Sequence, residues 1–333
     1  MRTYFLVSGF FIGGLLLLGG VFFIFSNNEK TLEKETPHGK EDVVEVDKKE
    51  IVASFYPLAY FAKEIGGDRV EVINLSGAQD VHEYTPTPGD IVRIMGADLV
   101  LYQGANLEPW AEDMEDRFVR ENISHTAVLE RLQEEGLVQK DEHEDEHEDE
   151  HGDEYEDAHD HGGLDPHTWI DPILAQEMVY IIQTSLKDID QEGKSEYETR
   201  ATDLLNRLSV LDQEYIQRLS VCERDEVIVS HDAFEYIAHR YGFTTHTIAG
   251  ISPLDEPSAQ ALALLKQETK DGAEYILTES NSVTRYAETL SRETGLQMLS
   301  INPMGRGTLD PTKDYFDVAR DNLDAIALAL GCE

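Results

Sequence analysis

Residues 195–219 read SEYETRATDLLNRLSVLDQEYIQRL, a long stretch whose apolar residues recur at helical spacing. No strand-like run lies beside it, whereas short β-rich runs occur on both of its sides. We therefore interpret residues 195–220 as a helix that connects an N-terminal lobe, residues 50–193, to a C-terminal lobe, residues 221–333. The alternative is a helix that packs on one lobe only.

Each lobe alternates short β-rich runs with amphipathic stretches. The strand-like runs, which we expect to be buried, are residues 70–75, 99–102, 227–230, 245–248 and 275–278. Helical spacing covers residues 56–65, 88–95, 174–186, 233–241, 258–269 and 283–294. Because strand–helix alternation favours parallel sheets covered by helices, the sequence predicts an α/β fold with a parallel sheet in each lobe.

The composition restricts the possible partners. The chain has 333 residues, enough for two ordinary domains, and a formal net charge of −40. So acidic a protein is not expected to bind nucleic acid or anionic lipid headgroups. The charge fits a cationic ligand, although solubility or a saline habitat would also explain an acidic surface.

The N-terminus carries an apolar run of 22 residues, 4–25, followed by a polar stretch, 26–49. A membrane-spanning helix needs about 20 apolar residues, whereas the apolar part of a secretion signal has about 7–15. No small-x-small cleavage site follows. We expect an uncleaved signal anchor, a tether, and a soluble body on the extracytoplasmic side of the cell membrane. A long cleavable signal is the alternative.

The chain has two cysteines, Cys222 and Cys332. Outside the cytosol they could form a disulfide that closes a loop of about 110 residues. The alternative is a pair of unrelated buried thiols.

Residues 141–161 read DEHEDEHEDEHGDEYEDAHDH and form a loop rich in histidine and acid within the first lobe. Neutral imidazole is the commonest protein ligand for zinc and related metals, and carboxylates raise the local concentration of a dication. We expect weak auxiliary metal binding here, and a solvated acidic linker is the alternative. The histidines are His143, His147, His151, His159 and His161.

Four further residues are candidates for one tight metal site. His82, His231 and Glu279 follow strand-like runs, and His167 lies just before a helix. Ligands in open α/β sheets bind at the carboxyl ends of strands, so four ligands from strand ends, two in each lobe, predict a site in the cleft between the lobes. A single histidine after a strand is more often a loop or capping residue.

The donor set indicates which metal would bind. Three imidazoles and one carboxylate form a closed shell that suits zinc, whereas two imidazoles and two carboxylates would favour manganese or iron. A catalytic zinc normally keeps a position for water, and the chain has no HExxH or nucleophile motif. Asp165, Asp171 or Asp232 could hold the second nitrogen of a ligating imidazole. We assign no ligand role to His38, His125, His239 and His246.

An ordered set of motifs resembles the zinc-specific solute-binding proteins of metal ABC transporters, the ZnuA- and AdcA-like members of cluster A-I. The motifs are ASFYPL (53–58), VHEYTPTP (81–88), DPHTWIDP (165–172), SHDAF (230–234), AGISP (249–253) and TESN (278–281). The resemblance covers residues 50–333 and implies two α/β lobes joined by one rigid helix. It places the metal ligands at His82, His167, His231 and Glu279.

The resemblance also implies a function. We expect a monomer that captures Zn²⁺ and hands it to a membrane permease driven by an ATPase, and not an enzyme. The chain departs from many members because it has neither a lipobox cysteine nor a clear cleavage site. Val81 stands where some members have glutamate, which favours Glu279 as the fourth ligand. The alternatives are a manganese or iron carrier, disfavoured by His231, a secreted zinc hydrolase, and a metal-dependent surface adhesin.

Overall fold

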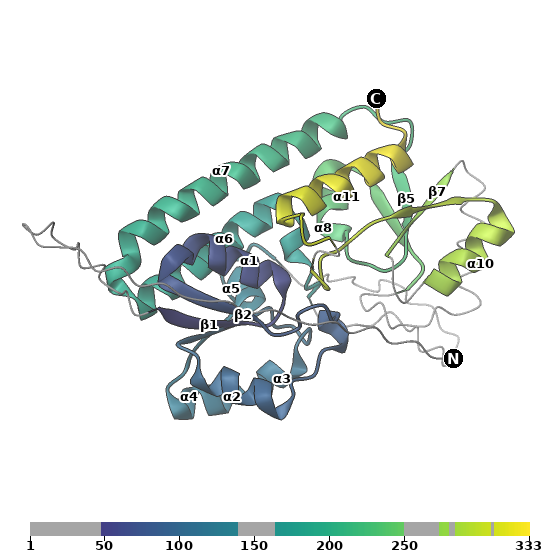
Figure 1. Cartoon of the computed structure of the whole chain (residues 1–333). Coiled ribbons are helices and arrows are strands. Elements are labelled where there is room, and N and C mark those ends of the chain that lie inside the picture. Colours follow the sequence, from purple (N-terminus) through teal and green to yellow (C-terminus); the bar gives the residue numbers. More distant parts are fainter. Residues whose placement is uncertain (1–47, 139–163, 250–272, 280–283, 308–309) are drawn as a thin grey trace, which may run out of the picture. The chain divides into compact units, whose positions relative to one another are not determined.

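The computed structural model describes residues 48–138, 164–249, 273–279, 284–307 and 310–333 (Figure 1). These residues form two four-stranded sheets in which all paired strands are parallel, with the strand orders β2-β1-β3-β4 and β6-β5-β7-β8. A long helix, α7 (Lys194–Arg218), connects them in the sequence. The predicted α/β fold with two parallel sheets and a long helix is therefore confirmed.

The first sheet has an apolar layer on each face, because successive side chains of a strand point to opposite sides. Ile51 and Leu101 pack on one face, and Val52 and Val100 pack on the other. The strands are β1 (Lys49–Ala53), β2 (Val70–Asn74), β3 (Leu99–Tyr102) and β4 (Ser124–Ala127). One face is covered by α1 (Tyr56–Gly66), α5 (Val128–Glu134) and α6 (Pro172–Ile189). The other is covered by α2 (Pro88–Gly96), α3 (Pro109–Glu112) and α4 (Glu115–Glu121).

The second sheet follows the same pattern. Val229 and Leu277 face the core that also contains α11, whereas Ile228 and Ile276 pack with Leu290 of α10. The strands are β5 (Glu226–Val229), β6 (Thr244–Thr247), β7 (Tyr275–Thr278) and β8 (Gln297–Ser300). The helices are α8 (Glu235–Tyr241), α10 (Thr284–Thr294) and α11 (Tyr315–Leu330).

Helix α7 packs on both halves of the chain. Its buried residues recur every three or four positions and so form one continuous face: Tyr197, Ala201, Leu204, Leu208, Leu211 and Tyr215. The helix lies alongside α1 and α6 of the first half and α11 of the second (Figure 1). The Tyr215 hydroxyl donates a 2.8 Å hydrogen bond to the Ala319 carbonyl of α11. The alternative that this helix packs on one lobe only is therefore wrong.

Two strands differ from the expectation of full burial. Strands β2 and β6 are edge strands, and most of their residues are half-buried or exposed, because an edge strand has a neighbour on one side only. Other elements were not predicted from the sequence, among them the short and partly polar strands β1, β4 and β8 and the C-terminal helix α11. Strand β1 begins at Lys49, the last residue of the expected tether.

Several predicted segments lie outside the described residues. These are the N-terminal run 4–25, almost all of the tether, the loop 141–161 and the helix 258–269. Within the part of the chain that the structure describes, no helix has the length and apolar character needed to cross a membrane.

Cys222 and Cys332 form a disulfide across a sequence separation of 110 residues. The sequence left open a disulfide or a pair of unrelated thiols, and the structure has the disulfide. The bridge joins the segment after α7 to the C-terminus that follows α11, so the second sheet lies within one covalent loop.

Glu108 is a buried carboxyl group that ties β1 to β3 in the first sheet. It accepts hydrogen bonds from the Ser54 hydroxyl at 2.5 Å and from the backbone N–H groups of Gln103 and Gly104, both at 3.1 Å. Burial raises the pKa of Glu108 to about 7, even though these donors act in the opposite direction. The folded protein therefore holds a proton at Glu108 at pH values where the unfolded chain has lost it.

This shift predicts a pH dependence of stability. Because the folded pKa lies above the unfolded one, Glu108 stabilises the fold below about pH 4.5, and this contribution is lost as pH rises towards 7. The Glu108→Gln variant cannot titrate, so its free energy of unfolding should vary less between pH 5 and pH 8 than that of the wild type. Urea denaturation at several pH values measures the difference. Parallel pH profiles of the two proteins would contradict the prediction.

Candidate metal centre

His82 is presented by a short 3-10 turn, Val81–Glu83, after the first sheet's edge strand β2. Asp80 begins this turn, and its Oδ1 accepts a 3.0 Å hydrogen bond from the backbone N–H of His82. The Asp80 side chain is almost fully buried. The carboxylate therefore fixes the backbone from which the His82 ring projects.

His167 is held in a similar way. Asp165 Oδ1 accepts a 2.9 Å hydrogen bond from the His167 backbone N–H and contacts the ring Nδ1 at 2.7 Å. With Nδ1 held by the carboxylate, Nε2 is the free ligand atom. His167 is only 1% exposed and lies just before the 3-10 turn Thr168–Ile170 that leads into α6.

His231 and Glu279 come from the second sheet. They follow β5 and β7, which are neighbouring parallel strands, so their side chains emerge at the same edge. The Glu279 carboxylate contacts the Nδ1 of His231, and both residues are buried. The Glu279 backbone N–H also donates a hydrogen bond to the Ser230 hydroxyl at 3.3 Å.

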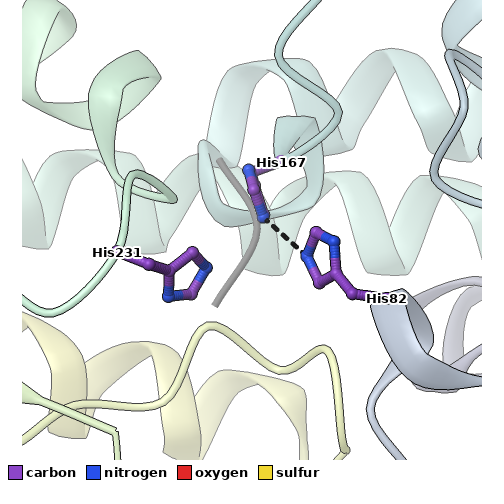
Figure 2. A group of neighbouring side chains, drawn as sticks. All are labelled: His82, His167 and His231. Carbon is purple, nitrogen blue, oxygen red and sulfur yellow. Dashed lines mark hydrogen bonds between the residues drawn. The ribbon is translucent and has the colours of Figure 1, made fainter. Parts of the chain in front are cut away.

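The three imidazoles converge on one point (Figure 2). Each of His82, His167 and His231 offers a ring nitrogen, and these atoms lie within 4.8 Å of one another. The Nε2 atoms of His82 and His167 are 3.3 Å apart. Two imidazole nitrogens bound to one tetrahedral zinc would be separated by about 3.3 Å, given Zn–N bonds of about 2.0–2.1 Å. The pair of His82 and His167 therefore already has the separation that a bound zinc requires.

Burial keeps the imidazoles of His82 and His167 neutral, and neutral imidazole is the form that binds metal. Burial and the neighbouring His167 lower the pKa of His82 to about 3. Burial and His231 lower the pKa of His167 well below its usual value. Burial alone would also lower the pKa of His231, but the carboxylates of Glu279, Asp80 and Asp232 together outweigh it, so that pKa is raised. Neutral imidazoles and a nearby carboxylate form the donor set that a divalent cation requires.

The expectations about supporting residues are met in part. Asp165 holds the second nitrogen of His167, as proposed from the sequence. Asp171 does not have this role, because its carboxylate caps the N-terminus of α6 and pairs with Arg240. Asp232 acts on His231 through its charge, which helps to raise the pKa of that ring.

The expectation that all four candidate ligands come from strand ends is wrong for His167, which precedes α6. Of the histidines given no ligand role, His125, His239 and His246 lie outside the cluster. His38 and the five histidines of the loop 141–161 are outside the described residues.

Asp80 was not predicted from the sequence. A signal was present, because both Asp80-Val-His82 and Asp165-Pro-His167 have the form Asp-x-His. In both segments the aspartate accepts a hydrogen bond from the backbone N–H of the histidine two residues later. This local turn is one that aspartate forms readily, and here it aims a histidine at the site.

Comparison with known proteins identifies the family. Residues 51–329 match the ZnuA family, described as "Zinc-uptake complex component A periplasmic". The chain is 34% identical to the high-affinity zinc uptake system protein ZnuA of Bacillus subtilis, over 84% of this chain and 87% of that protein. It is 32% identical to the zinc-binding lipoprotein AdcA of Streptococcus pneumoniae, a longer protein of which the chain spans only 55%.

Solved structures agree with this assignment. The Zn(II)-bound ZnuA-like domain of Streptococcus pneumoniae AdcA superposes with a TM-score of 0.68 at 29% identity, over 85% of this chain and 99% of that one. The laminin-binding protein Lmb of Streptococcus agalactiae, titled a bifunctional protein with adhesin and metal transporting activity, has a TM-score of 0.71 at 27% identity and the same coverage. These matches confirm the resemblance drawn from the motifs. The chain belongs to the ZnuA family, the zinc-binding components of zinc uptake systems.

Proposed function

We propose that this protein captures Zn²⁺ outside the cytoplasm and delivers it to the permease of an ABC transporter, without a catalytic step. The observation that carries the proposal is the convergence of three ring nitrogens, from His82, His167 and His231, within 4.8 Å. The first two histidines belong to the first half of the chain and the third to the second half. A metal held by all three would lie in a cleft between the lobes.

The proposed ligands are His82, His167, His231 and Glu279. The carboxylate of Glu279 contacts His231, so it lies beside one of the three rings that would bind the metal. Three imidazoles and one carboxylate complete a four-coordinate shell and leave no position for a reactive water, which supports transport over hydrolysis. His231 supports zinc over manganese, because manganese prefers oxygen ligands.

Zinc titration of the purified protein against a competing chelator tests this function. We expect one tight equivalent of zinc, which manganese at equal concentration does not displace. Gel filtration with light scattering should give the mass of one chain with and without zinc. Displacement of zinc by manganese would favour the manganese carrier, and hydrolytic turnover by the zinc-loaded protein would favour the hydrolase.

We further propose that the body is tethered to the cell membrane by residues 4–25, because that apolar run is long enough to span a bilayer. The protein should fractionate with membranes and keep its N-terminus, and N-terminal sequencing of the membrane fraction measures this. A mature protein that is free in solution and begins after Ser26 would instead identify a cleaved signal.

The loop 141–161 is proposed to concentrate zinc near the site. His143, His147 and His151 are four residues apart among thirteen carboxylates, and the loop leads directly to His167. Deletion of 141–161 should leave the tight equivalent intact, remove additional weak equivalents and slow zinc capture at low concentration. Calorimetry and stopped-flow measurements on the two proteins test this. Identical stoichiometry would make the loop an acidic linker.

Adhesion is a second candidate function. It is supported by the likeness to the Streptococcus agalactiae laminin-binding protein, which is described as having both adhesin and metal transporting activity. Binding of the zinc-loaded protein to immobilised laminin, with albumin as the control surface, measures it. Equal retention on both surfaces would remove this candidate.

A further inference from the structure

One loop of the second half, residues 302–307, contacts the segments that carry both histidines of the first half. The Gly305 carbonyl accepts a 3.2 Å hydrogen bond from the backbone N–H of Val81, the residue before His82. The Pro303 carbonyl accepts a 2.7 Å hydrogen bond from Trp169 Nε1, two residues after His167. The loop thus bridges the two halves of the chain immediately beside the metal cluster.

The 302–307 loop has a defined conformation of its own. Asn302 exchanges hydrogen bonds with Asn322 of α11, at 2.9 and 2.7 Å. Its side chain also accepts from the Met304 backbone N–H and donates to the Gly307 carbonyl. Met304 is fully buried with a φ of +66°, a left-handed conformation that is unfavourable for a non-glycine residue and persists only where surrounding contacts enforce it. Helix α11 therefore fixes the position of the loop.

Arg306 connects this loop to the turn that carries His82. Its Nε donates a 3.1 Å hydrogen bond to Asp80 Oδ2, while Asp80 Oδ1 accepts from the His82 backbone N–H. The Asp80 side chain is 4% exposed and that of Arg306 is 21% exposed, so the ion pair is largely shielded from water. Removing one partner from such a pair leaves a buried charge without compensation.

Arg306 also affects the charge near the metal cluster. Asp80 brings a negative charge to the turn that carries His82. Arg306 offsets this charge. Asp165 and Glu279 also contact rings of the cluster, and their combined charge matches that of one divalent cation.

We propose that Arg306 is a positioning residue for the metal site. Through Asp80 it holds the turn of His82 in the geometry that a metal requires, and it makes that geometry depend on contact between the two halves of the chain. This role rests on the proposed zinc site. It predicts that Arg306 governs how long zinc stays bound, although it is not itself a ligand.

The test begins with Arg306→Met, which removes the charge and keeps a long side chain. We expect zinc affinity to fall by about tenfold, mainly through faster release, as is typical when a residue that supports a metal ligand is lost. The visible spectrum of the Co²⁺-loaded protein should change, because this spectrum reports coordination geometry. Arg306→Lys should recover part of the affinity, since it restores the charge beside Asp80.

Arg320→Met is the matched control. Arg320 forms a two-point ion pair with Glu214, at 2.7 and 3.1 Å, that joins α11 to α7 without contact with the metal cluster. Its loss should leave zinc affinity and the Co²⁺ spectrum unchanged. A double-mutant cycle with Asp80→Asn isolates the coupling, because asparagine can still accept from the His82 backbone N–H but cannot form the ion pair. The combined loss of affinity should be smaller than the sum of the two single losses.

Other outcomes would overturn the inference. Wild-type affinity and spectrum in Arg306→Met would show that the ion pair does not position His82. A gain in affinity would show that Arg306 acts only by repelling the cation. Failure of the wild-type protein itself to bind zinc in the same titration would reject the proposed zinc site, which is a separate result.

Discussion

Replacement of His82 with alanine is expected to weaken zinc binding by more than about 100-fold, because a direct ligand should contribute more than a residue that only supports one. The His82 Nε2 lies 3.3 Å from that of His167, so its loss removes a nitrogen from the centre of the cluster. The apo protein should unfold at an unchanged temperature. His82 is the suitable ligand for this test, because neither carboxylate that contacts another ring, Asp165 or Glu279, would lose its partner.

His239→Ala is the control for this variant. His239 is an exposed histidine on α8 outside the cluster, so its replacement should leave zinc affinity unchanged. Both variants are best made in a protein without residues 141–161, so that weak binding by that loop does not obscure the loss. The His82 assignment would be wrong if the two variants bound zinc equally tightly in a chelator competition.

The sequence predicted those strands whose apolar pattern matches their buried position in the fold. Strands β3, β5 and β7 are central, and each has a run of at least three apolar residues that are mostly buried, so each was recognised. Strand β4 has the sequence SHTA, which lacks an apolar run, and it is placed by its parallel pairing with β3. Helix α11 carried a readable signal, the capping box of Asp314 and Asp317, which was overlooked.

The candidate site could be predicted where the chain itself places a residue at the end of a strand or in a local turn. His231 and Glu279 follow β5 and β7 directly, and Asp165 acts on a histidine two residues away. The contact between Asp80 and Arg306 spans 226 residues, and no local pattern indicates it. Asp171 was misassigned because an aspartate near a ligand and before a helix fits two roles, and helix capping is the one it has.

Trp169 packs in the core and also contacts His167 of the metal site. It is fully buried, its ring centroid is 4.6 Å from that of Phe55 and 5.2 Å from that of His167, and its Nε1 donates to the Pro303 carbonyl. Its own carbonyl accepts a 2.6 Å hydrogen bond from the Tyr315 hydroxyl of α11. One side chain and its backbone therefore join the first sheet, the turn after His167 and the second half of the chain.

Trp169→Ala should reduce the free energy of unfolding of the apo protein by about 3–5 kcal/mol, because it removes the largest buried side chain and leaves a cavity. Zinc at 100 times its dissociation constant adds only about 2.7 kcal/mol, so metal should restore the loss incompletely. Trp169→Phe keeps most of the packing and loses one hydrogen bond, and should cost about 1 kcal/mol from that bond. Denaturant titrations with and without zinc measure these differences. If Trp169→Ala reduced the free energy of unfolding by less than Trp169→Phe does, the surrounding core would close over the cavity. Trp169 would then not connect the two halves of the chain.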